Sequence, residues 1–209
     1  HNDNLMIQSA LRVSYTSPKV MHWITGLLLW LEMNDNTSKL NSYCAVAEQI
    51  ARQSIIENFF KPCKDGNYRL GVGTPHIVFN YLDYLIWKND RNLYKDFTFE
   101  FRNSVEHWYP RRPKESEIET WKDGGVDRFG NLCIIQRNVN SKFYNLPPEG
   151  KKTSFRSMIE KGSLKLRLMS KLTAPDKGIS ANQNWKDHVC AEHEREMINL
   201  LSEDCGLEE

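Results

Sequence analysis

The chain has 209 residues, of which 40% are hydrophobic and 26% are charged, and its formal net charge is +1. This composition favours a soluble globular protein with room for a buried core. No apolar run reaches the roughly 18 residues that a membrane helix needs, so the sequence excludes a membrane-spanning helix.

The first residue is His1 rather than Met, and nothing near it resembles a signal peptide. We therefore expect the chain to be a piece of a longer protein. Its five cysteines form no Cys-x-x-Cys pair. That usage favours a reducing, cytoplasmic location over a structural zinc site.

The first 95 residues predict a helical bundle. One helix is expected over residues 19–32, after Pro18 and before Asn34-Asp35-Asn36. A second helix is expected from a cap at Ser38 to about Phe60.

A polar, Gly-containing loop over residues 62–73 separates the second helix from a third. Thr74 is the expected cap of this third helix, with Pro75 at its first position. The apolar stripe expected along it consists of Val78, Tyr81, Leu82, Leu85 and Ile86.

The apolar pattern changes from a helical period to a period of two after residue 95. Residues 97–101 alternate, residues 105–109 continue the pattern, and a second strand is expected over residues 131–136. A long polar connection, residues 110–125, joins the two strands.

An Asn-rich loop and Pro147-Pro148 are expected after the second strand, followed by a helix over residues 154–161. Strand, loop, strand, loop and helix make a ββα unit. Two more helices are expected, over residues 163–171 and from a cap at Ser180 to about Leu201.

Positive charge gathers in the middle of the chain. Residues 102–171 hold 15 Lys and Arg against 8 Asp and Glu, a balance of +7, whereas the remaining residues hold 13 against 19, a balance of −6. A basic segment of this kind favours a polyanionic partner, although a solvated surface of mixed charge has the same composition.

Three motifs in this basic segment and just before it carry a family resemblance. F-R-N-S-V-E-H-W-Y-P, G-N-L-C-I-I and N-S-K-F-Y-N-L-P-P resemble the HNH-like C-terminal domain of GmrSD-type restriction endonucleases, which combine a DUF262 domain with an HNH domain. The resemblance covers most of the chain from about residue 70. It implies a mostly helical α+β fold, a helical bundle around a small HNH-like ββα-metal motif. We expect residues 1–95 to form a helical subdomain and residues 96–209 the nuclease core.

The resemblance also implies the site. Glu106 matches the acid that binds the metal, His107 the general base, Asn131 the Asn that ties the loop carrying the base, and Asn140 the last metal ligand. Glu stands where Asp is commoner, and Asn stands where His is commoner. Asn138 competes with Asn140 for the last position. Carboxylate and amide oxygens suit a single Mg²⁺ or Mn²⁺ ion.

The expected site has one geometric requirement. Neighbouring side chains of a strand point to opposite faces, so Glu106 and His107 share a site only where the chain bends.

Lys142 is expected to act on the phosphate or its leaving oxygen. Five further cations are expected to contact the nucleic-acid backbone: Arg111, Arg112, Arg137, Lys151 and Lys152.

The activity that the resemblance implies is metal-dependent DNA cleavage by a module of a bacterial anti-phage restriction system. The implied partners are phage DNA and an N-terminal nucleotide-sensing domain of the full-length protein. Two alternatives stay open at this point: a catalytically silent module that binds nucleic acid, and an interaction domain whose docking surface is the helical residues 1–95. RNA also stays open as the substrate, because backbone contacts do not identify the sugar.

Overall fold

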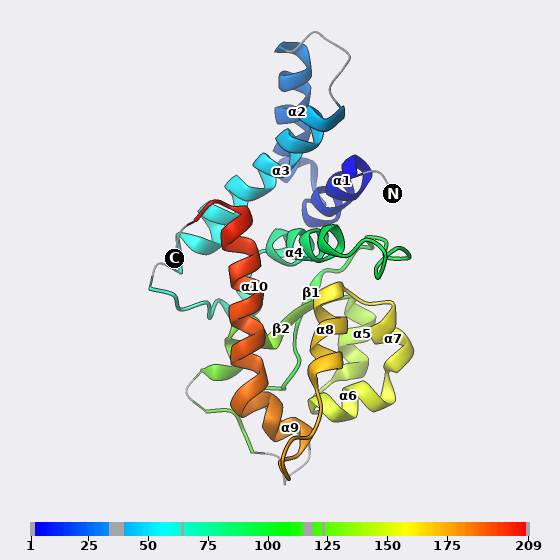
Figure 1. Ribbon diagram of the computed structural model, residues 1–209, viewed down its shortest axis with the longest axis vertical. Helices are drawn as coiled ribbons and strands as arrows, with labels where there is room; N and C mark the ends of the chain where they lie inside the picture. The colour runs from blue at the N-terminus through cyan, green and yellow to red at the C-terminus, as the bar shows by residue number, and fades with distance from the viewer. Residues whose placement is uncertain (1–2, 34–39, 64, 115–118, 123, 208–209) are drawn as a thin grey trace.

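The computed structural model describes residues 3–33, 40–63, 65–114, 119–122 and 124–207. In these ranges the protein is mostly helical, with one two-stranded antiparallel sheet (Figure 1). The expectation of a mostly helical α+β fold is therefore confirmed. Within the described residues, no helix is both long enough and apolar enough to cross a membrane.

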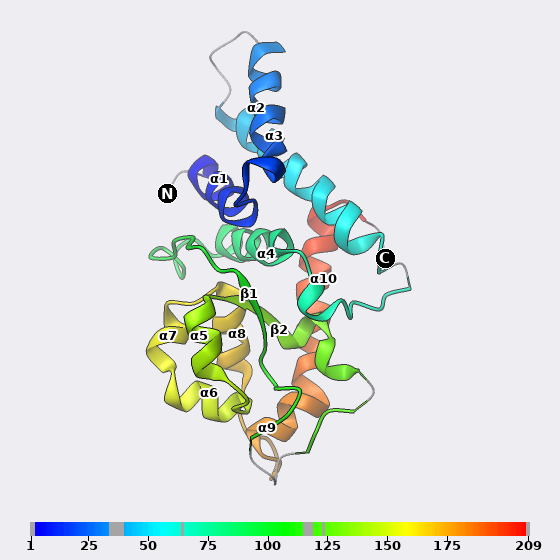
Figure 2. The same ribbon diagram turned by 180° about the vertical axis from the view of Figure 1, so that it is seen from behind.

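Three helices begin the chain: α1 (Asp3–Ser14), α2 (His22–Met33) and α3 (Leu40–Ile55), the last extended by a π-helical turn, Ile56–Phe60. Helices α2 and α3 correspond to the two that the sequence predicts first, whereas α1 was not predicted. The expected helix end at Asn34-Asp35-Asn36 and the expected cap at Ser38 lie outside the described residues. Figures 1 and 2 show α2 projecting from the body of the molecule.

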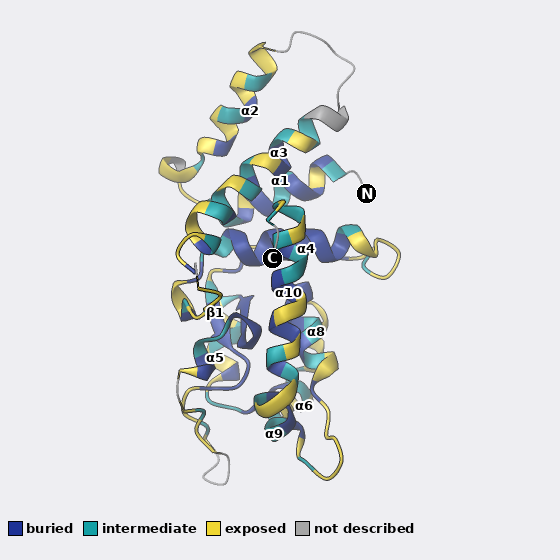
Figure 3. Cartoon of the chain, turned by 60° about the vertical axis from the view of Figure 1, so that its left-hand side comes forward, coloured by how far each residue is buried: buried dark blue, intermediate teal, exposed yellow. Residues whose placement is uncertain are grey.

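Helix α4 (His76–Asn89) is the central helix of the fold. Every residue from Ile77 to Trp87 is buried, and α4 contacts α1, α3, α8 and α10 (Figure 3). All five residues of the expected apolar stripe are buried, and the residues between them are buried too, because this helix is covered all round. The expected Thr74 cap is wrong, because Pro75 is the N-cap and the Thr74 hydroxyl donates to the Gly71 carbonyl at 2.8 Å.

The sheet consists of β1 (Ser104–His107) and β2 (Leu132–Ile135), paired antiparallel. Ser104 pairs with Ile135 at one end of the ladder, and His107 pairs with Leu132 at the other. Both strands were predicted, but the alternating residues 97–101 form no strand in the structure. Two 3-10 turns precede β2, at Gly125–Asp127 and Phe129–Asn131.

Helices follow β2 to the end of the described chain. They are α5 (Arg137–Phe143), α6 (Pro148–Ser154), α7 (Arg156–Glu160), α8 (Leu164–Leu172), α9 (Ala181–Asn184) and α10 (Cys190–Asp204), with a π-helical turn at Trp185–Val189 before α10. The expected Asn-rich loop is wrong, because it forms α5. The expected helix over residues 154–161 corresponds to α7, whereas α6 before it was not predicted. The Ser180 cap is confirmed, since its hydroxyl accepts from the Gln183 N–H at 3.3 Å.

The sheet separates two hydrophobic clusters, because alternate residues of a strand face opposite sides. Leu132 and Ile134 pack with the first four helices, whereas Cys133 and Ile135 pack with Trp108 and the α5–α9 side. The views in Figures 1 and 2 agree, with the sheet between α4 and the α5–α8 group. The first cluster draws residues from both sides of position 95, and the division into 1–95 and 96–209 stays a prediction.

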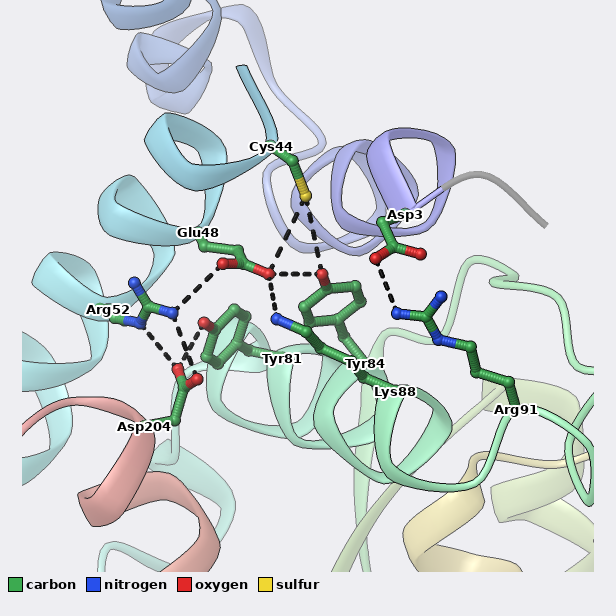
Figure 4. Close-up of polar contacts among 9 residues, drawn as sticks. All are labelled: Asp3, Cys44, Glu48, Arg52, Tyr81, Tyr84, Lys88, Arg91 and Asp204. Carbon is green, nitrogen blue, oxygen red and sulfur yellow. Dashed lines mark hydrogen bonds and ion pairs between the residues drawn. The ribbon is translucent and has the colours of Figure 1, made fainter. Parts of the chain in front are cut away.

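A polar network joins helices α3, α4 and α10 (Figure 4). Tyr84 and Lys88 of α4 each donate to the same oxygen of Glu48 on α3, at 2.6 Å. Arg52 of α3 donates to Asp204 of α10 at 2.8 and 3.2 Å. This network fixes α3 and α10 against the central helix.

Candidate functional site

His107 ends β1, and its ring is held by a carboxylate that the sequence did not single out. The ring Nε2 lies 2.8 Å from Oδ1 of Asp127, and Arg111 donates to the same oxygen at 2.7 Å. Burial lowers the pKa of His107 below 6.5, although Asp127 opposes the shift. Burial alone would raise the pKa of Asp127, but hydrogen bonds from Arg111 and His107 bring it below its usual value.

These shifts define one proton arrangement at neutral pH. The imidazole of His107 is neutral and Asp127 is an anion, so Nε2 carries the hydrogen and donates to the carboxylate. The tautomer follows from the hydrogen bond. Nδ1 is then left with its lone pair, as a base requires.

Two glycines, Gly124 and Gly71, allow the backbone around Asp127 to pack closely enough for its carboxylate to contact His107. Asp127 ends a 3-10 turn that follows Gly124, whose φ of 68° is left-handed. Gly71, with φ of 57°, lies against the carboxylate, and a Cβ on Gly71 would be 2.8 Å from Asp127 Oδ1. Glycine is therefore needed at position 71 both for its backbone angle and for space.

Asn131 holds the segment that follows His107. Its side-chain oxygen accepts from the Tyr109 N–H at 2.8 Å, and its amide donates to the carbonyls of Tyr109 and Val126 at 2.9 and 2.8 Å. The indole of Trp185 donates to the same oxygen at 3.1 Å. A wholly buried Asn with all these partners fixes the backbone just past His107.

Glu106 meets a lysine rather than the imidazole beside it. Its Oε1 accepts from the ammonium of Lys151 at 2.7 Å, and Lys151 is completely buried. Burial raises the pKa of Glu106, and Lys151 opposes that rise. Burial likewise lowers the pKa of Lys151, opposed by Glu106.

Asn140 lies on α5 near the same face of β1 as Glu106. Its amide nitrogen donates to the hydroxyl of Ser104 at 2.5 Å. Ser104 and Glu106 are two residues apart in the strand, so their side chains share a face. The competing candidate, Asn138, is exposed.

The predicted site residues therefore divide between two faces of β1. Glu106 and Asn140 lie on the α5–α6 side, whereas His107 turns toward Asp127. The bend that would bring Glu106 and His107 together is absent from β1, where both residues keep their place in the ladder. Among the described residues, no three His, Cys, Asp or Glu side chains gather as a metal site.

The predicted cations differ in exposure. Four are exposed: Arg111, Arg112, Arg137 and Lys142. Lys152 is half-buried and donates to the Thr173 carbonyl at 2.6 Å. Lys151 is completely buried, so its ammonium cannot contact a nucleic-acid backbone, and the prediction is wrong for this residue.

Sequence reasoning missed two residues of the site, Asp127 and Lys165. A signal for Asp127 was present, because the residues just before β2 lie opposite the end of β1 in an antiparallel pair. Lys165 lies one turn before Met169 on the buried face of α8, and it donates to backbone carbonyls next to β2. Only its place among apolar residues could have indicated burial.

Comparison with protein families gave one match. The family described as GmrSD restriction endonucleases, C-terminal domain, matches residues 69–200, which is more than half of the chain. The matched range contains both strands and all the site residues named above. Comparisons with curated proteins and with solved structures gave no match.

Proposed function

The chain belongs to the family of GmrSD restriction endonuclease C-terminal domains, and from this membership we propose that it hydrolyses DNA phosphodiesters with His107 as the general base. The observation that carries the proposal is the contact of 2.8 Å between His107 and Asp127 at the end of β1. It joins an imidazole with a lowered pKa to a carboxylate that orients it.

In this mechanism the free Nδ1 of His107 takes a proton from the attacking water. The ring then becomes an imidazolium whose Nε2–H still donates to Asp127, and the carboxylate stabilises the new charge. Arg111 fixes the same carboxylate oxygen. General-base catalysis of this kind contributes roughly 10²–10⁴-fold.

The chemistry of two side chains fits the divalent ion that the family implies. Glu106 and Asn140 offer hard oxygen donors on one face of β1, and Mg²⁺ usually takes only one or two carboxylates, with waters and phosphate oxygens. Lys151 occupies Oε1 of Glu106 alone. We propose these two residues as ligands of Mg²⁺ or Mn²⁺. Because they face away from His107 across β1, such an ion would neutralise charge on the DNA backbone without contacting the base.

The order β1, β2, α5 supports the proposal of an HNH-like ββα motif, with Asn140 on its helix. The exposed cations Arg111, Arg112, Arg137 and Lys142 are proposed to contact the DNA backbone, Lys142 at the scissile phosphate, and half-buried Lys152 is a weaker candidate. Such contacts make binding fall steeply with salt and carry no sequence choice.

The biological setting is also a proposal. A restriction endonuclease module suits defence against phage DNA, and in the full-length protein an N-terminal nucleotide-sensing domain would control it. That arrangement calls for assays of the full-length protein beside those of the isolated chain.

Plasmid cleavage tests the proposed activity. The wild type, His107→Ala and His188→Ala are compared with Mg²⁺, with Mn²⁺ and with a chelator, in both forms of the protein. His188 is an exposed histidine and serves as the matched control. We expect the wild type and His188→Ala to nick the plasmid and His107→Ala to lose roughly 100-fold or more. Equal nicking by all three proteins would overturn the assignment of the base.

A catalytically silent DNA-binding module is the second candidate, favoured by one observation. Glu106 is paired with Lys151 instead of standing open beside His107. This candidate predicts salt-dependent DNA binding without cleavage under any metal, in the full-length protein as well. Metal-dependent nicking that requires His107 would exclude it.

A further inference from the structure

Among the described residues, Lys151 of α6 is one of two lysines whose side chains are buried next to the sheet. It is 0% exposed, and its ammonium contacts three oxygens in a row along the chain. The acceptors are Glu106 Oε1 at 2.7 Å, the His107 carbonyl at 2.5 Å and the Trp108 carbonyl at 3.0 Å. All three N–H donors of this ammonium can therefore be satisfied at the end of β1.

Lys165 of α8 is the second, and it is 1% exposed. Its ammonium contacts the carbonyls of Phe129, Gly130 and Leu132 at 2.9, 3.4 and 2.6 Å. These acceptors lie in the 3-10 turn before β2 and at the first residue of β2. Lys165 therefore donates to the backbone at the start of β2, just as Lys151 donates to the backbone at the end of β1.

The two lysines act at the same end of the ladder. His107 and Leu132 are its last pair, and each directs its carbonyl to a buried ammonium. Asn131 lies between the two sets of acceptors, and its carbonyl accepts from the Trp108 N–H at 2.8 Å. The backbone that carries the base is thus held by side chains from two helices.

We propose that Lys151 and Lys165 are positioning residues for the base, fixing the backbone on both sides of the contact between the His107 segment and Asn131. Glu106 acts in this arrangement as the counterion of Lys151. The inference rests on the proposed function, since it assigns what holds the base of that reaction.

The chemistry of the ammonium group supports this role. Burying a charge costs free energy, and an apolar side chain would fill the same space without that cost. An apolar side chain cannot satisfy carbonyls at the end of a ladder, however. A single tetrahedral donor group collects oxygens from successive residues, which no partner strand can do.

The test follows the imidazole by NMR, with isotope-labelled histidine, in the wild type, Lys151→Met, Lys151→Gln and Lys152→Met. Lys152 is the adjacent lysine, bonded to the Thr173 carbonyl, and is the matched control. Lys151→Met should split or broaden the His107 resonance, because the backbone that carries the ring loses its donor. Lys151→Gln keeps a donor, so the resonance should stay single. Lys152→Met should leave the resonance unchanged.

A His107 resonance that stays single and sharp in folded Lys151→Met, as it should in Lys151→Gln, would overturn the proposal. If neither variant folds, the wild type decides. Its hydrogen-bonded ammonium protons should exchange slowly enough to be seen at neutral pH, with contacts to protons of His107 and Leu132. Absence of these two signals would also overturn it.

Kinetics separates this inference from the proposed function. Lys151→Met should lower kcat roughly 100-fold with little change in KM, because misplacement of the base affects the chemical step more than binding. If His107→Ala cleaves like the wild type, the proposed function fails, whereas the NMR readout still reports whether the lysines hold this segment.

Discussion

At His107, a single hydrogen bond decides which ring nitrogen can accept a proton. The contact with Asp127 assigns the hydrogen to Nε2, and the contact of Arg111 with the same carboxylate keeps that oxygen in place. Both contacts cross loops, so they depend on the fold rather than on neighbours in the chain.

Asp127→Asn tests the orientation of the ring. The amide presents no anion to stabilise the imidazolium, so kcat for plasmid nicking should fall roughly 100-fold or more. The acid limb of the pH profile should move to lower pH, because Asp127 raises the pKa of His107. Asp65→Asn, at an exposed position, is the control. An unchanged rate and profile in Asp127→Asn would leave the carboxylate without a role in the reaction.

His193 makes the fold sensitive to acid. Both of its ring nitrogens lack a hydrogen-bond partner within the described residues, and burial lowers its pKa well below 6.5. The unfolded chain takes up a proton near pH 6.5 while the folded chain does not. Stability is therefore lost as the pH falls below that value, by about 1.4 kcal/mol per pH unit.

His193→Leu should remove this share of the acid sensitivity. The measurement is urea unfolding at neutral pH and one pH unit below 6.5, with exposed His188→Leu as the control. We expect the variant to lose about 1.4 kcal/mol less than the wild type over that unit. The same pH dependence in His193→Leu and in the wild type would assign the sensitivity to other groups.

At the scale of elements, the turn before β2 is packed against α10 through a glycine. A Cβ on Gly130 would lie 2.4 Å from the Cys190 carbonyl oxygen and 2.7 Å from Cβ of Glu194. The Gly130 N–H also donates to Glu194 at 2.9 Å. The close approach fixes Asn131, the next residue, relative to the long C-terminal helix.

Gly130→Ala should force the turn away from α10 and destabilise the fold by about 1–3 kcal/mol. Gly73→Ala is the matched control, because nothing lies within 4 Å of a Cβ built there. Thermal unfolding of both variants measures the difference. A Gly130→Ala protein as stable as Gly73→Ala would show that α10 moves freely enough to admit a methyl group.

The elements that the sequence predicted well are those whose pattern is local. Strand β2 is a short apolar run between turn residues, and the Ser180 cap precedes its helix directly. Helix α5 was missed because Asn138 and Asn140 favour loops. Burial of Phe143 in the second hydrophobic cluster overrides that preference. The alternation over residues 97–101 predicted a strand, but the part of the chain that the structure describes offers it no neighbouring strand to pair with.

The candidate site could be predicted only in part, because some of its residues lie far from His107 in the sequence. Glu106, His107 and Asn131 stand in compact motifs, so a family pattern could point to them. Asp127 lies 20 residues from His107. Lys151 lies 44 residues from the carbonyl it binds. Contacts of that separation depend on register and on packing, which one sequence does not display.

At the scale of the whole molecule, the network around α4 joins helices from both ends of the chain. Arg52 of α3 and Tyr81 of α4 both donate to Asp204, near the end of α10 (Figure 4). Burial alone would raise the pKa of Asp204, but these hydrogen bonds lower it below 3.8. The carboxylate therefore stabilises the fold at neutral pH, and that stability is lost as the pH falls through its lowered pKa.

Asp204→Asn removes the charge that Arg52 and Tyr81 share. We expect a loss of about 1.5–3 kcal/mol in urea unfolding at neutral pH. Glu203→Gln, at the exposed neighbouring position, should change stability by less than about 0.5 kcal/mol. Plasmid nicking by folded Asp204→Asn should be kept, since the network lies away from β1. Equal stability of the two variants would mean that α3 and α10 are held by apolar packing alone.

The sealed position of Lys151 and Lys165 has a practical use. Acetylating reagents modify surface amines readily but cannot enter the interior of a folded protein, so peptide mass spectrometry should find these two lysines unmodified and Lys142 modified. The pattern reports the integrity of the β1–β2 end in any preparation, without DNA and without turnover. A preparation that cleaves nothing could then be assigned to one of two cases, a disassembled β1–β2 end or an intact one.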